Sequence, residues 1–103
     1  MVKVTVFYPN GPGAHFEMAY YCTKHMPLVQ RLLGRAVKKI AVEEGLAGGA
    51  PGTAATYIAM GHLYFDSVED FLQAWAPHAE EIVADVPKYT NVEPLIQISA
   101  VKL

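Results

Sequence analysis

The fold is decided by residues 57–86, YIAMGHLYFDSVEDFLQAWAPHAEEIVADV. The first nine, Tyr57–Phe65, alternate two sets of side chains, and both sets contain large apolar residues. This pattern predicts a β-strand that is covered on both faces. From Val68 to Val86 apolar residues recur every three or four positions, which predicts an amphipathic helix. Pro77 interrupts that helix, because proline lacks a backbone donor and crowds the preceding turn.

The same order of elements occurs in the first half of the chain. The pattern predicts a strand at 2–8, a helix at 16–33 that is kinked at Pro27, and a second strand at 38–46. A last strand is expected at 93–102. Two consecutive strand-helix-strand units predict an α+β, ferredoxin-like βαββαβ sandwich, with one four-stranded antiparallel sheet and both helices on one face.

The composition favours a second copy of the chain as a partner. The 103 residues are 52% hydrophobic and only 17% charged, and this length allows a single domain, residues 1–103. Two helices cover only one face of the sheet, yet the other face also carries bulky apolar side chains. We therefore expect a homodimer in which two sheets pack face to face.

Other features of the composition exclude several classes of protein. The net charge is -2 and the basic residues are scattered, which is not typical of a nucleic-acid-binding protein. No apolar run approaches the ~20 residues that span a bilayer. Cys22, the single cysteine, cannot form an intramolecular disulfide, so we expect a reducing, cytoplasmic environment and a buried thiol.

Five motifs resemble the EthD-like family, which is named for ethyl tert-butyl ether degradation. The most specific is YYCTKHMPL at Tyr20–Leu28, on the predicted first helix. The others follow in the family's order: GLAGG at Gly45–Gly49, GHLYFDS at Gly61–Ser67, APHA at Ala76–Ala79 and EPLIQIS at Glu93–Ser99.

The resemblance carries expectations about assembly and chemistry. EthD-like proteins belong to the dimeric α/β-barrel superfamily, so the resemblance implies a barrel built from two copies. The family is classed with oxidoreductases, and fungal relatives resemble dehydratases of polyketide pathways. It therefore implies a small apolar ligand of aromatic, polyketide-like or ether-derived character, although a fold alone does not determine function.

His25 is the foremost catalytic candidate. It lies on the apolar stripe of the first helix, one turn after Tyr21, so its side chain is expected to point toward the sheet. A desolvated imidazole titrates near neutral pH and can act as a general acid or base, with Tyr21 as its helper. The alternative is a structural histidine that hydrogen-bonds a carbonyl freed by Pro27. The resemblance to the EthD motif favours the catalytic role.

Five further residues are candidates for substrate binding: His78, Tyr64, His62, Asp85 and Gln97. His78 borders the apolar stripe of the second helix. His62 and Tyr64 alternate on the strand at 57–65 and can line either the cavity or the dimer interface. Asp85 and Gln97 are candidates for orienting a ligand or a histidine.

No motif for a cofactor or metal is present. The glycine-rich loop lacks the Lys-Ser/Thr of a phosphate-binding loop, and no GxGxxG follows the first strand. The four histidines show no metal-binding spacing. Two hypotheses follow: a cofactor-independent enzyme that performs a dehydration, an isomerisation or an oxygen-dependent step, or a non-enzymatic carrier of an apolar metabolite.

Overall fold

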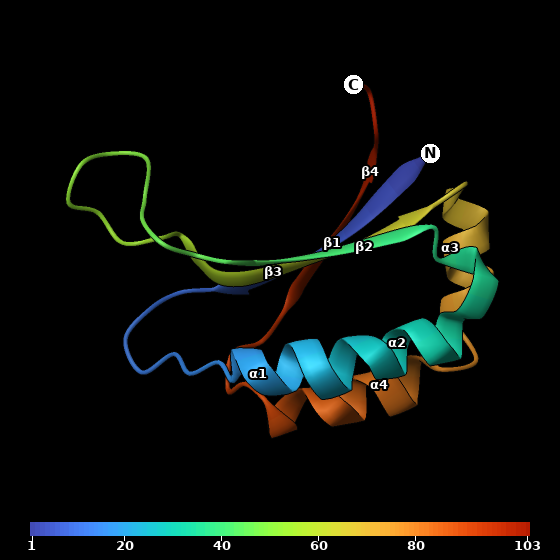
Figure 1. The fold of residues 1–103 in the computed structure, drawn as a ribbon, viewed down its shortest axis with the longest axis horizontal. Helices are drawn as coiled ribbons and strands as arrows, with labels where there is room; N and C mark the ends of the chain where they lie inside the picture. Colours follow the sequence, from blue (N-terminus) through green and yellow to red (C-terminus); the bar gives the residue numbers. More distant parts are fainter.

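The computed structural model describes residues 1–103 as one antiparallel sheet with its helices on one face (Figure 1). The strands are β1 (Val2–Pro9), β2 (Lys39–Glu44), β3 (Tyr57–Phe65) and β4 (Leu95–Ala100). Their spatial order is β2-β3-β1-β4, so each helical connection passes over a neighbouring strand. This is the predicted α+β, ferredoxin-like arrangement. The bounds of β3 match the prediction, whereas β2 and β4 are shorter than expected.

The helices are α1 (Met18–Tyr20), α2 (Met26–Leu33), α3 (Val68–Trp75) and α4 (Ala79–Asp85), joined by a π-helical turn at Tyr21–His25 and by 3₁₀ turns at Gly34–Ala36 and Val86–Lys88. The irregularity expected at Pro27 lies in the five residues before it. There the N–H of Met26 bonds the carbonyl of Tyr21, five residues back. Pro27 follows directly after this turn, at the start of α2.

Pro77 divides the second predicted helix into α3 and α4. The two halves run in different directions, and α4 lies beside α2 below the sheet while α3 stands at one end of it (Figure 1). Ser67 begins α3 by accepting a hydrogen bond from the N–H of Asp70, at 3.0 Å.

The core lies between the sheet and the helices. Alternation along β1 and β3 sends one set of side chains toward the helices, where the buried residues include Val4, Tyr8, Leu63, Phe65, Tyr21, Val29, Leu33, Phe71 and Ile82. The opposite face of the sheet carries no helix (Figure 1).

Two further observations concern Cys22 and the helices. Cys22 is exposed, so the prediction of a buried thiol is wrong: it lies on the outer side of the helical segment, with Sγ 3.7 Å from the sulfur of Met18. None of the helices combines the length and apolar character that crossing a bilayer requires.

Candidate functional site

An imidazole and three tyrosines meet between the sheet and the helices. His25 and Tyr21 come from the π-helical turn, and their rings stack with centroids 5.4 Å apart. Tyr8 comes from the end of β1, and Tyr89 follows the 3₁₀ turn after α4. The hydroxyls of Tyr8 and Tyr89 share a 2.7 Å hydrogen bond, and the Tyr89 hydroxyl lies 3.4 Å from His25 Nε2. All four residues are buried.

Asp85 orients the imidazole from the side of α4. Its Oδ2 lies 2.9 Å from His25 Nδ1, and both side chains are almost fully buried. Its other oxygen accepts a 2.9 Å hydrogen bond from the Tyr20 hydroxyl and lies 3.5 Å from Lys88 Nζ. An ionised carboxylate only accepts, so Nδ1 carries the proton and Nε2 presents its lone pair toward Tyr89.

The protonation states follow from burial and hydrogen bonding. Burial lowers the pKa of His25, and the neighbouring Asp85 carboxylate only partly offsets this. Burial alone would raise the pKa of Asp85, but hydrogen bonds from His25 and Tyr20 lower it overall. Burial raises the pKa of Tyr8, Tyr21 and Tyr89. At neutral pH the cluster therefore holds a neutral imidazole beside a carboxylate, together with neutral phenols that can donate hydrogen bonds.

This cluster borders a small cavity of about 60 Å³. Apart from His25 and the tyrosines, the lining is apolar and carries no Lys, Arg, Asp or Glu: Val6, Met26, Val29, Gly61, Leu63, Trp75, Ile82, Val83, Val86, Pro94 and Ile96. A ligand here would meet polar groups only at the end where the imidazole and the phenols lie. The arrangement suits the transfer of one proton to or from an apolar molecule.

Gly61 makes room for this cluster. A Cβ added at this position would overlap the Tyr21 hydroxyl, which lies against the backbone of β3. The glycine is thus required by the close approach of an aromatic ring rather than by a turn.

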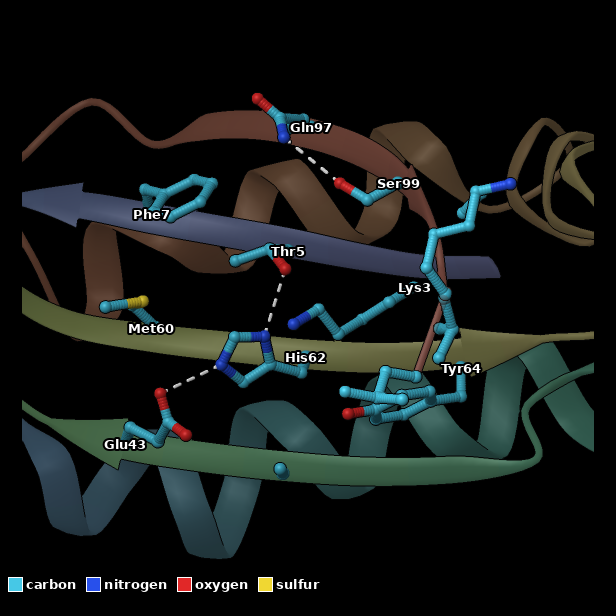
Figure 2. A pocket seen from close by; sticks show the side chains of 14 residues that line it. Lys3, Thr5, Phe7, Glu43, Met60, His62, Tyr64, Gln97 and Ser99 are labelled. Carbon is cyan, nitrogen blue, oxygen red and sulfur yellow. Dashed lines mark hydrogen bonds and ion pairs between the residues drawn. The ribbon is translucent and has the colours of Figure 1, made fainter. Parts of the chain in front are cut away.

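A second polar cluster lies on the open face of the sheet (Figure 2). His62 Nδ1 lies 3.0 Å from Thr5 Oγ1, and its Nε2 lies 3.0 Å from Glu43 Oε1. Gln97 donates a 3.0 Å hydrogen bond to Ser99 on the same face. Tyr64 borders this surface, which has a broad hollow of about 590 Å³.

The structure thus divides the residues predicted from the sequence. It brings His25, Tyr21 and Asp85 together at the inner cavity. His62, Tyr64 and Gln97 lie across the sheet on the open face and cannot line the same cavity. His78 immediately precedes α4 and lines neither space.

The site residues predicted from the sequence include neither Tyr8 nor Tyr89. Both belong to a set of six tyrosines whose flat apolar bodies and polar tips suit an apolar ligand, but no spacing links them to His25 as it does Tyr21. No group of three or more His, Cys, Asp or Glu side chains is close enough to hold a metal ion.

The lowered pKa of His25 predicts how stability depends on pH. In the unfolded chain the imidazole takes up a proton as the pH falls through its ordinary value of 6.5, whereas the folded chain does so only at lower pH. The contribution of His25 is therefore complete above about pH 6.5 and is lost as the pH falls toward its folded-state pKa. Asp85, whose pKa is also lowered, loses its contribution to stability as the pH falls below its ordinary pKa of 3.8.

We expect a smaller free energy of unfolding at pH 5 than at pH 7 in urea titrations, and a smaller difference in His25→Gln. His15→Gln, in an exposed loop, is the control and should keep the difference of the unaltered chain. Equal or greater stability at pH 5 in the unaltered chain would contradict this assignment.

Comparison with known proteins identifies the family of this chain. The family model described as EthD domain matches residues 16–93. An uncharacterized 11.0 kDa protein in the thcB-thcC intergenic region of Rhodococcus erythropolis is 34% identical over 94 residues, which is 88% of this chain and 85% of that protein.

Solved structures agree. An EthD-like protein from Ralstonia eutropha JMP134 superposes with a TM-score of 0.95 at 44% identity, over 99% of this chain and 92% of that one. For an ethyl tert-butyl ether degradation family protein from Bacillus halodurans C-125 the TM-score is 0.74 at 19% identity, over 99% of both chains. A DABB family protein with a ferredoxin-like fold from Mesorhizobium loti shares the fold, with a TM-score of 0.56 at 12% identity over 99% of this chain and 96% of that one. The family model matches most of the chain, and the proteins from Rhodococcus erythropolis and Ralstonia eutropha are 34% and 44% identical to it. This protein therefore belongs to the EthD family.

Proposed function

We propose that this EthD protein binds a small apolar molecule that carries a carbonyl or hydroxyl oxygen, and that His25 acts on it as a general acid/base without a cofactor. The observation that carries the proposal is the Asp85–His25 pair at the polar end of an otherwise apolar cavity. Asp85 holds Nδ1, so Nε2 is left as the basic atom.

The chemical step that this geometry supports is proton abstraction from a carbon beside a carbonyl group. Nε2 takes the proton, the C–H electron pair forms the enolate, and Asp85 stabilises the imidazolium. Tyr8 and Tyr89 share one hydrogen bond, which leaves one O–H of the pair to donate to the enolate oxygen, and both phenols stay neutral. An enolate is a possible first intermediate in dehydration, in isomerisation and in reaction with oxygen, so this step is compatible with all three reactions.

The test is exchange of carbon-bound hydrogen with solvent. The protein is incubated with 2-butanone in D₂O, and deuterium incorporation beside the carbonyl is followed by ¹H NMR against buffer alone. Exchange faster than in buffer supports the enzyme. Binding of the ketone without exchange favours the second candidate, a carrier or accessory protein for an apolar metabolite, for which the almost wholly apolar cavity lining is also suitable.

We also propose a homodimer formed through the open face of the sheet. The chain exposes 6378 Å², whereas a monomer of this mass is expected to expose about 5,700 Å². Its radius of gyration of 14.0 Å also exceeds the value of about 13 Å expected for this length. Phe7, Met60 and Tyr64 lie on this uncovered face (Figure 2). Sedimentation at micromolar concentration should show twice the chain mass of 11.3 kDa, and a stable monomer would disprove the pairing.

A further inference from the structure

Two apolar side chains connect the inner cavity to the surface. Val83 on α4 and Ile96 on β4 both line the cavity, yet they are 57% and 53% exposed. Pro94 lines it beside them, and Ile98 continues the same face of β4 outward. The register explains the exposure: Ile96 and Ile98 lie opposite Val6 and Val4 of β1 on the helix side of the sheet, but β4 is an edge strand that the helices leave uncovered.

The result is an exposed apolar surface at the mouth of the cavity, called the groove below and defined by Val83, Pro94, Ile96 and Ile98. Exposed large apolar side chains that join a cavity mark a ligand surface more often than scattered ones do.

The size of the cavity restricts what can enter it. Its volume is about 60 Å³, whereas an apolar cavity that holds benzene measures about 150 Å³. The enclosed part therefore admits an oxygen-bearing group and the carbons beside it, but no aromatic ring. The rest of any larger ligand must lie in the groove.

The charge of the lining restricts the ligand further. No Lys or Arg lines the cavity or the groove, so nothing there would balance a carboxylate or a phosphate. The polar end of the ligand is therefore uncharged.

On these grounds, and building on the proposed function, we infer that the ligand is an unbranched, uncharged aliphatic ketone or alcohol. Its oxygen lies at Tyr8 and Tyr89, and its hydrocarbon chain runs outward along the groove.

The test measures dissociation constants for straight-chain methyl ketones from 2-butanone to 2-octanone by ligand-observed NMR. Affinity should rise about two- to fourfold for each methylene group placed in the groove. Acetophenone has as many carbons as 2-octanone and should bind more weakly, because its ring cannot follow the carbonyl inward. Equal or tighter binding of acetophenone, or no dependence on chain length, would overturn the inference.

Val83→Glu places a charge on the groove wall at an exposed helical position. It should remove the gain with chain length, so that 2-octanone binds no more tightly than 2-butanone. Val68→Glu, on the exposed side of α3 away from the cavity, is the matched control and should keep the gain. Ile96→Thr tests the opposite wall in the same way. If the groove is instead covered by a second copy, Val83→Glu will alter sedimentation and leave the ketone series unchanged, which also overturns the inference.

The outcome is separate from that of the proposed function. Exchange without chain-length dependence refutes only the groove. Chain-length dependence without exchange refutes only the acid/base role of His25.

Discussion

Replacing His25 by glutamine should slow the exchange of ketone α-protons by about 100-fold or more, the usual contribution of a general base. Glutamine is similar in length and can donate to Asp85, so the cavity keeps its shape and its hydrogen bond to α4. What it lacks is a basic nitrogen at the position of Nε2. The affinity for 2-butanone should change little, because the ligand oxygen is bound by the tyrosine hydroxyls.

The measurement is the exchange rate at saturating ketone, together with the dissociation constant from NMR titration. His15→Gln serves as the control, since His15 is an exposed loop residue paired with Glu17. An unchanged exchange rate in His25→Gln would show that the base lies elsewhere. If the unaltered protein catalyses no exchange and His25→Gln binds 2-butanone more weakly, His25 has a binding role instead.

Gly61→Ala should lower the free energy of unfolding by about 1–3 kcal/mol, the usual cost of placing extra atoms in a packed core. The added methyl group would overlap the Tyr21 hydroxyl, so the tyrosine ring, which stacks on the His25 imidazole, must shift away from β3. In a domain of this size each kcal/mol lowers the Tm by about 4–8 °C. Calorimetry or thermal circular dichroism measures the change.

A double substitution isolates the cause. Tyr21→Phe removes the clashing oxygen, so Gly61→Ala should destabilise the Tyr21→Phe chain less than it destabilises the unaltered chain. Gly49→Ala, where nothing lies within 4 Å of an added Cβ, should leave the Tm almost unchanged. Equal effects of Gly61→Ala in both backgrounds would contradict this account of the packing.

Local patterns in the sequence were enough to predict the sheet. The period of two in Tyr57–Phe65 and the apolar character of both its faces specify a central strand, and the structure places β3 there with the predicted bounds. The helices were predicted less well. Pro77 and Pro27 reveal that the helices are interrupted, but the direction of α4 and the π-helical turn depend on packing against the sheet, which no local pattern records.

The site was predicted only as far as spacing along one helix reaches. Tyr21 and His25 are one turn apart, so their proximity follows from the sequence. The contacts of His25 with Asp85 and Tyr89 join residues 60 and 64 positions apart and arise from the tertiary fold. The face of β3 that carries His62 and Tyr64 could not be predicted. Both faces of this strand are apolar, so alternation alone does not indicate which face meets the helices.

The π-helical turn makes the geometry of the cavity depend on the number of residues between Tyr21 and His25. Successive residues of an α-helix are rotated by about 100° around its axis. Removing one residue between Tyr21 and His25 would convert the wide turn to a regular one and rotate one of the two rings out of the cavity, whichever side of the helix stayed docked. In this segment, insertions and deletions are therefore more damaging than many substitutions, and relatives that keep this site should keep the number of residues between the tyrosine and the histidine.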